Sequence, residues 1–217
     1  MRQPALLNES AQWRLSSLHP LSQGLIEIDA FGEPIVEHAE LRWSKQERGD
    51  AKLFEVRDLA QGLALANRAG WLAPAALEIA YAQACEQLLG LTPPSRAADI
   101  RELVVGSQRI AGWAWRLAAA ADELALSPSA WLGYREDWLN WLEGATGARI
   151  HDSFVRIGGV ASDFADQTLQ SLLELANQEV PTLDVSVWQG AAVLNASDAA
   201  SRTSDIARSI AEHATAL

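Results

Sequence analysis

The spacing of apolar residues changes near Lys52, and this change limits the possible folds more than any other feature. Between residues 11 and 43, the stretches AQWRLSSL and GLIEID alternate apolar and polar residues, which is typical of strands. Phe31-Gly32-Glu33-Pro34 supplies a turn signal. Beyond Lys52 the apolar period is helical. The sequence therefore predicts an α+β fold, mainly α, with a small N-terminal antiparallel sheet packed on a helical bundle.

Prolines and glycines divide the helical part into segments. Gly90 is a C-terminal stop signal, and Pro93-Pro94-Ser95 opens a long helix. The helices expected from this punctuation cover about 53–72, 75–89, 95–126, 129–144 and 166–178. Beyond them we expect one short strand within VPTLDVSVWQGAAVL and a last helix capped by Ser197 or Asp198.

These segments form three expected regions. An N-terminal β region covers 1–50, a helical bundle with a β corner near 150–160 covers 51–180, and a C-terminal strand and helix cover 181–217. At the corner, a strand from Ile150 to Ile157 should lead into a turn at Gly158-Gly159, because paired glycines tolerate backbone angles that other residues avoid.

Composition excludes several classes of protein. The net charge of −11, without a block of Lys and Arg, argues against a nucleic-acid partner, whose phosphates need cationic contacts. A single cysteine, Cys85, excludes an internal disulfide and a self-contained Cys-ligated cluster or Cys₄ metal site. The apolar runs are shorter than the about 18 residues of a membrane-spanning helix, and the N-terminus has no signal-peptide pattern. We therefore expect a cytoplasmic protein that contacts a membrane only through partners.

Several side chains could carry chemistry, and each also has an ordinary structural explanation. Four aromatic residues share one helix face and form either helix packing, which we favour, or a binding surface: Trp131, Tyr134, Trp138 and Trp141. His19 suits an exposed loop, and His151 suits a core histidine with satisfied ring nitrogens. Arg48 suits an exposed turn, and Asp122 suits a solvated helix end. No motif of a nucleophile, phosphate loop or dinucleotide site is present.

Several short motifs occur in an ordered series that chance does not readily explain. They are His19-Pro20-Leu21-Ser22-Gln23-Gly24, Glu47-Arg48-Gly49 through Arg57, Asn67-Arg68-Ala69-Gly70-Trp71, Ala80-Tyr81 through Leu91, Pro93-Pro94-Ser95-Arg96-Ala97, and Ala145 through Gly159. In this order they resemble the quinone-pocket subunit family (the 49 kDa or D subunit) of respiratory complex I, or NADH-quinone oxidoreductase. That family is related to the large subunit of nickel–iron hydrogenases. The resemblance runs from about Leu18 to Phe164 and then fades.

The resemblance implies a site shared with a partner. The family binds no cofactor by itself, packs on a small iron–sulfur subunit with a [4Fe–4S] cluster, and forms the head of a quinone cavity. Arg48 and His151 match residues next to that cluster. Four positions match the cavity: His19, Gln23, Trp71 and Asp122. Gln23 and Trp71 replace the family's quinone-binding histidine and tyrosine, so the cavity is altered.

Two functions therefore follow from the resemblance. The first is a subunit of an NADH-quinone oxidoreductase-like or membrane-hydrogenase-like electron-transfer complex, peripheral on the cytoplasmic face of the inner membrane. The second is a non-catalytic, degenerate paralogue that serves assembly or structural contact. The fold would be a partial hydrogenase-large-subunit-like fold, truncated and divergent. Catalysis by the chain alone is not expected, no metal is expected on it, and in isolation it should form a homodimer or depend on a partner.

Overall fold

A computed structural model describes residues 13–15, 26–32, 36–43, 49–70, 72–123, 125–182 and 208. The chain divides into two compact units, residues 1–52 and 53–217, which are described separately. The architecture is α+β and mainly α, as the apolar spacing predicts. The expected C-terminal strand and helix lie outside the described residues, apart from helical Arg208.

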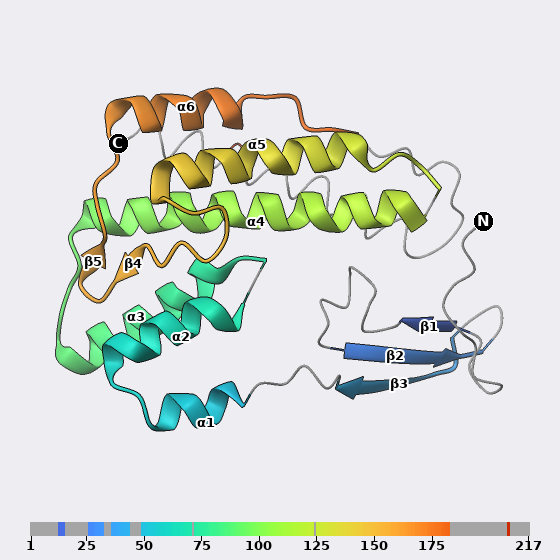
Figure 1. Cartoon of the computed structure of the whole chain (residues 1–217), viewed down its shortest axis with the longest axis horizontal. Coiled ribbons are helices and arrows are strands. Elements are labelled where there is room, and N and C mark those ends of the chain that lie inside the picture. The colour runs from blue at the N-terminus through green and yellow to red at the C-terminus, as the bar shows by residue number, and fades with distance from the viewer. Residues whose placement is uncertain are drawn as a thin grey trace. The chain divides into compact units, whose positions relative to one another are not determined.

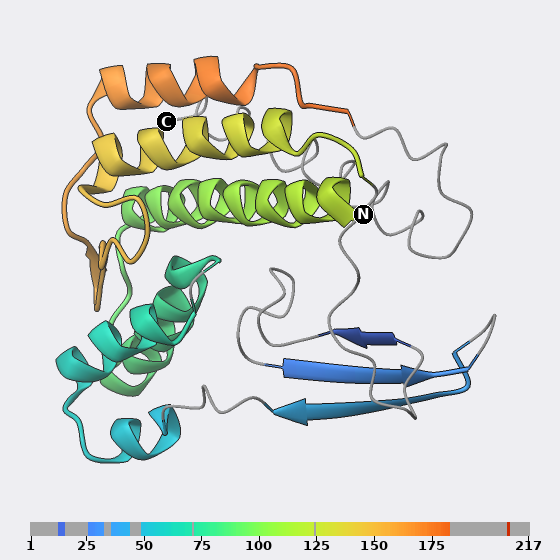
Figure 2. The same cartoon turned by 45° about the vertical axis from the view of Figure 1, so that its right-hand side comes forward.

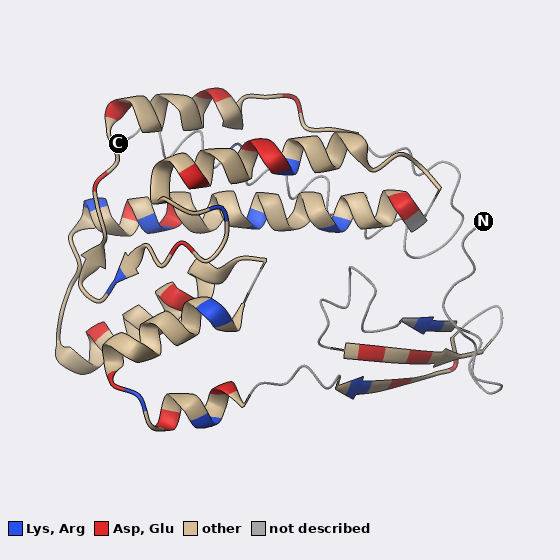
Figure 3. Ribbon diagram, viewed as in Figure 1, with Lys and Arg blue, Asp and Glu red and all other residues tan. Residues whose placement is uncertain are grey.

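The first unit contains a three-stranded antiparallel sheet in the order β1-β2-β3 (Figure 1). Its strands are β1 (Trp13–Leu15), β2 (Ile26–Phe31) and β3 (His38–Trp43). Buried Asp29 on β2 forms ion pairs with Arg14 on β1 and Arg42 on β3. Figure 3 shows these basic residues on the outer strands beside the acidic central strand. The hydrogen bond from Arg14, opposed by burial, lowers the pKa of Asp29, so the charged carboxylate holds the three strands together.

The second unit begins with two helices where the sequence analysis expected one over 53–72. These are α1 (Asp50–Glu55), which spans the boundary between the units, and α2 (Leu59–Ala69). Asp58 lies between them in an extended conformation, and its carboxylate accepts a hydrogen bond of 2.8 Å from the backbone N–H of Gln61. A side chain that satisfies a free N–H at a helix start defines an N-cap, so Asp58 marks the start of α2 after α1 has ended at Glu55.

The remaining helices match the predicted ranges closely. They are α3 (Pro74–Leu89), α4 (Ser95–Glu123), α5 (Ser129–Thr146) and α6 (Asp166–Ala176). Gly90 follows α3 with a φ of 66°, and its N–H bonds to the carbonyl of Gln87, as a left-handed C-cap requires. Helices α4, α5 and α6 lie side by side in both views, while α2 and α3 form a second pair (Figures 1 and 2).

The main core lies among α4, α5 and α6. The aromatic residues that share one face of α5 are all buried in it, which confirms helix packing: Trp131, Tyr134, Trp138 and Trp141. Trp138 is 0% exposed, and its ring meets that of Tyr134 edge-on at 6.2 Å. No helix in the described part of the chain is both long and apolar enough to cross a membrane.

The corner after α5 differs from the predicted strand over Ile150–Ile157. Only a short hairpin forms, from β4 (Val155–Arg156) and β5 (Gly159–Val160), with Gly158 in its turn at a φ of 89°. Residues 151–154 are irregular, and His151 and Ser153 have positive φ values of 59° and 47°. Non-glycine residues rarely adopt such angles. The strand prediction was wrong because tertiary hydrogen bonds, and not strand pairing, hold this segment.

Candidate functional site

Side chains from three helices meet at the irregular corner that carries His151. The half-buried imidazole of His151 has its Nδ1 2.8 Å from the backbone carbonyl of Asn67 at the end of α2. Within the described part of the chain, no hydrogen bond to its Nε2 occurs. This contact through one ring nitrogen fixes the orientation of the ring.

A polar cluster lies directly behind this histidine. The side-chain amide of Asn67 donates to Oε2 of Glu78 on α3 at 3.2 Å and to Oδ1 of Asp152 at 3.4 Å. On the other side, the amide of Gln108 on α4 donates to Oδ2 of Asp152 at 3.1 Å and accepts from the N–H of Ala75 at 2.8 Å. Asn67 is 0% and Glu78 1% exposed. Buried polar groups need such partners, so the network fixes how the three helices approach the corner.

The two carboxyl groups of the cluster have unusual proton affinities. Burial, and next the negative charge of Asp152, raise the pKa of Glu78 from 4.5 to about 7. Hydrogen bonds from Val155 and Asn67 and the charge of Arg156 oppose this with smaller effects. Burial also raises the pKa of Asp152. Burial thus makes each carboxyl easier to protonate than in water, and Glu78 changes charge near neutral pH.

This proton affinity predicts a pH-dependent stability. Because the folded chain binds the Glu78 proton more tightly than the unfolded chain, the stabilisation is complete below pH 4.5 and is lost as pH rises through about 7. A pKa difference of this size corresponds to on the order of 3 kcal/mol. Denaturant titrations at about pH 5 and about pH 8 should show this loss of unfolding free energy.

Two variants serve as controls for the pH dependence. Glu78→Gln keeps the shape of the neutral carboxyl and should lose most of the difference between the two pH values. Glu102→Gln, at an exposed position of α4, should retain it. Equal pH dependence in Glu78→Gln and the unmodified chain would contradict the assignment to Glu78.

A buried ion pair fixes the hairpin beside the cluster. Glu86 on α3 and Arg101 on α4 are each 3% exposed, and their closest oxygen and nitrogen lie 2.6 Å apart. Arg101 also donates to the carbonyls of Arg156 and Gly159, and Glu86 accepts from the N–H of Gly158 at 2.7 Å. Together they tie β4 and β5 to the two helices that supply Glu78 and Gln108.

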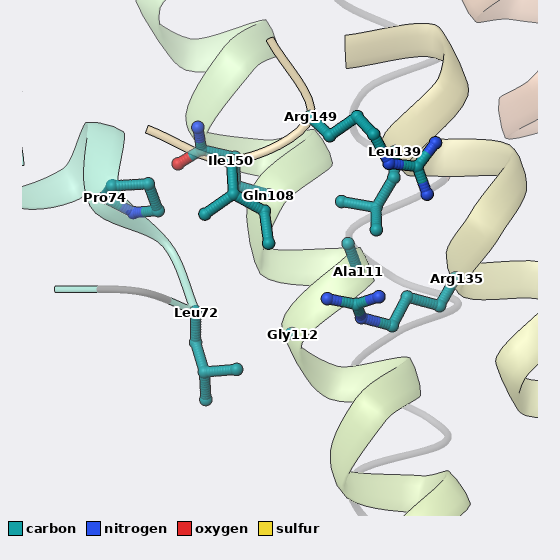
Figure 4. Close-up of a pocket in the computed structure, with 9 residues that line it drawn as sticks. All are labelled: Leu72, Pro74, Gln108, Ala111, Gly112, Arg135, Leu139, Arg149 and Ile150. Atoms are coloured by element: carbon teal, nitrogen blue, oxygen red, sulfur yellow. The ribbon is translucent and has the colours of Figure 1, made fainter. Parts of the chain in front are cut away.

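A small cavity of about 10 Å³ adjoins the cluster at Gln108 (Figure 4). Its lining residues are Leu72, Pro74, Gln108, Ala111, Gly112, Arg135, Leu139, Arg149 and Ile150. This space holds about one water molecule and is far smaller than a pocket for an organic cofactor. In the described ranges, no group of three or more His, Cys, Asp or Glu side chains could hold a metal ion.

The structure describes two of the six residues singled out from the sequence. His19, Gln23, Arg48 and Trp71 lie outside the described residues. Asp122 is exposed on the last turn of α4. It follows Gln108 on that helix by about 21 Å, at a rise of about 1.5 Å per residue, so it does not belong to the His151 cluster.

Sequence reasoning missed the four polar residues of the cluster, namely Asn67, Glu78, Gln108 and Asp152. A signal for two of them existed. Glu78 and Gln108 interrupt the apolar stripes of α3 and α4 at positions that face the core. Polar residues at such positions need buried partners, but the sequence does not say which.

Comparison with known proteins agrees with the motifs. Residues 125–217 match the family model of the respiratory-chain NADH dehydrogenase 49 kDa subunit. The D subunit of the NADH-quinone oxidoreductase of Sphingopyxis alaskensis is 31% identical over 169 residues, which are 76% of this chain and 42% of that protein. The D subunit of the Saccharopolyspora erythraea enzyme is 34% identical over 173 residues, 76% of this chain and 38% of that protein. The chain thus spans about two fifths of these relatives. The family model extends to residue 217, so the match continues beyond Phe164, where the recognisable motifs fade.

A solved structure shares the fold. One chain of the membrane-bound sulfane sulfur reductase, an archaeal respiratory membrane complex, superposes with a TM-score of 0.68 at 23% identity and covers 79% of this chain and 47% of that one. In sequence, the chain matches the family of the respiratory-chain NADH dehydrogenase 49 kDa subunit, also called the D subunit, as its motifs predicted.

Proposed function

We propose that this chain is a subunit of an electron-transfer complex of the NADH-quinone oxidoreductase type, and that it packs on an iron–sulfur subunit near a quinone-type cavity. The family supports membership of such a complex. The observation that carries the finer proposal is the fixed position of His151. Its Nδ1 is 2.8 Å from the carbonyl of Asn67, and the corner around it has left-handed backbone angles. Such strained conformations persist where the surroundings determine them, and they are typical of functional sites.

In this proposal each candidate residue has a defined task. Arg48 and His151 lie near the [4Fe–4S] cluster of the partner, where a positive or protonatable group stabilises the added electron. His19, Gln23, Trp71 and Asp122 line the altered quinone cavity. Glutamine and tryptophan donate hydrogen bonds there but deliver no proton, so Gln23 and Trp71 would bind a quinone without protonating it. Cluster and quinone both belong to the assembled complex.

Purification of the native complex through a tag on this chain tests the proposal. An iron–sulfur subunit should co-purify, and its cluster should show a reduction potential that falls with pH. A one-electron step coupled to one proton gives about 59 mV per pH unit. His151→Gln should remove that slope, whereas His38→Gln, exposed on β3, should preserve it. Recovery of the chain without iron in any associated fraction would contradict the proposal.

A non-catalytic subunit for assembly or structural contact is the second candidate. The observation that favours it is the replacement of the family's histidine and tyrosine by Gln23 and Trp71. Quinone binding separates the two functions. Saturable binding of a soluble ubiquinone analogue by the native complex, lost in Trp71→Ala, supports a working cavity, and absence of binding in the intact complex supports the structural role.

The surface of α3 supports the need for a partner. An exposed apolar stripe runs along this helix through Leu77, Ala80, Ala84 and Leu88 and continues at Leu91, just past the helix end. Leu88 alone is 77% exposed, and a groove of about 430 Å³ adjoins Leu91. Continuous apolar surface of this kind marks interaction sites in soluble proteins.

The stripe predicts self-association when the partner is missing. The isolated chain should form a homodimer or larger species, and light scattering over a range of concentrations measures this. Leu88→Glu should shift the chain toward monomer, because a charge in the stripe is costly to bury. Gln170→Glu, at an exposed position on α6 outside the stripe and the groove, is the control. A wild-type monomer at every concentration would refute the prediction.

In the cell, we expect the chain to lie in the cytoplasm, at the surface of the inner membrane. Membrane contact would come from other subunits of the complex.

A further inference from the structure

Two carboxyl groups lie beneath the corner that carries His151, and they share one hydrogen-bond donor. Oε2 of Glu78 and Oδ1 of Asp152 lie 3.2 and 3.4 Å from the same nitrogen, Nδ2 of Asn67. Glu78 is 1% exposed, and Asp152 is half-buried. Two negative charges that accept from one buried nitrogen repel each other, and the charge of Asp152 is, after burial, the main cause of the raised pKa of Glu78.

The donors around the pair are mostly neutral: besides side-chain amides, the backbone N–H of Val155 donates to Glu78 and that of Phe154 to Asp152. Helix α2 contributes the neutral amide of Asn67, and α4 contributes the neutral amide of Gln108. From the corner and hairpin come His151 and Arg156. The guanidinium of Arg156 donates to the carbonyls of Ser153 and Val155, and its effect on Glu78 is smaller than that of burial or of Asp152.

A second observation also indicates a proton in this cluster. Asn67 is 0% exposed, and its Oδ1 has no hydrogen-bond partner in the described structure. A buried acceptor without a donor is costly. In the alternative placement of this amide, with Oδ1 and Nδ2 exchanged, the oxygen would accept the O–H of a protonated carboxyl in place of the N–H contacts given above.

We propose that Glu78 and Asp152 form one proton-binding site, which holds a single proton between its two carboxyls at neutral pH and releases it with a movement of the His151 corner. The physical link is Asn67, whose side chain binds both carboxyls and whose backbone carbonyl binds His151. Asp152 lies between two residues with positive φ, so its contacts help hold the strained backbone. Loss of the shared proton leaves two negative charges that repel each other. We expect the corner to move in response, because it is the part of the pair's surroundings that is not helical.

Carboxyl titration by NMR tests the proposal on the full chain with ¹³C-labelled Asp and Glu side chains. The two carboxyls should titrate as a coupled pair with well-separated midpoints. Asp152→Asn should lower the midpoint of Glu78 by about one unit or more, since it removes the neighbouring charge. Glu78→Gln should lower that of Asp152 in the same way. Glu102→Gln, exposed on α4, should change neither.

The ¹⁵N shifts of the His151 ring report the movement of the corner. They should follow the titration of the pair in the unmodified chain, and this component should vanish when Glu78→Gln and Asp152→Asn are combined. Independent titration of the two carboxyls at ordinary acidic midpoints in the unmodified chain would overturn the proposal. This measurement needs no variant, so it can be made even if a variant fails to fold. The iron–sulfur partner and the quinone play no part in these measurements, so failure here leaves the proposed function untouched.

Discussion

Arg101→Met should destabilise the chain strongly, because it breaks the buried ion pair that anchors the hairpin. Met fills part of the volume of Arg101 but leaves the carboxylate of Glu86 buried without its cation. Removal of one partner from a buried ion pair costs about 3–5 kcal/mol. The carbonyls of Arg156 and Gly159 also lose their donor, which should loosen the β4–β5 hairpin. Guanidinium chloride unfolding followed by circular dichroism measures the loss.

Arg96→Met is the matched control for this substitution. Arg96 pairs with Asp163 at 2.9 Å, but Asp163 is 67% exposed. Exposed ion pairs contribute about 0–1 kcal/mol, so Arg96→Met should have a small effect. The double variant Glu86→Met with Arg101→Met should cost less than the two single losses added together, because it leaves no uncompensated charge. Additive losses would contradict the importance of the pair.

Trp138→Ala should destabilise the helical unit by about 3–5 kcal/mol, the usual cost of a deleted core aromatic side chain. Trp138 is 0% exposed and lies in the core that joins α4, α5 and α6. The substitution removes apolar burial, opens a cavity and ends the edge-on contact with Tyr134. The same unfolding experiment measures the change.

Val56→Ala provides the comparison for a truncated apolar side chain outside the core. Val56 belongs to the same unit and is 74% exposed, so its truncation should change stability by less than about 0.5 kcal/mol. Losses of similar size in Trp138→Ala and Val56→Ala would mean that the face of α5 is not the core of this unit.

The helices of the second unit were predictable where the positions of proline and glycine agree with the helical spacing of apolar residues. Pro74 and Gly90 bound α3, and Pro94 precedes α4, so local backbone preferences alone place these ends. The break between α1 and α2 was missed because the helical apolar period continues across it. Asp58 ends that continuity through one side-chain hydrogen bond, which the periodicity does not reveal.

The corner near His151 shows why the candidate site was harder to predict. Its apolar residues and paired glycines favoured a strand, and local preference was correct for the turn at Gly158. The residues before the turn instead follow contacts made by Asn67 and Gln108 from distant helices. His151 itself was found through resemblance to a family, and its neighbours came from the fold.

By itself, the sequence determined the mainly helical α+β class, the approximate ends of α3 to α6 and the family, because these depend on local backbone preference and on short ordered motifs. Only the tertiary structure decided that Glu78 and Asp152 share an amide donor beneath His151 and that Glu86 and Arg101 hold the hairpin. The reason is that proton affinity and ion pairing depend on burial and on distances between residues far apart in the chain, which no local pattern encodes.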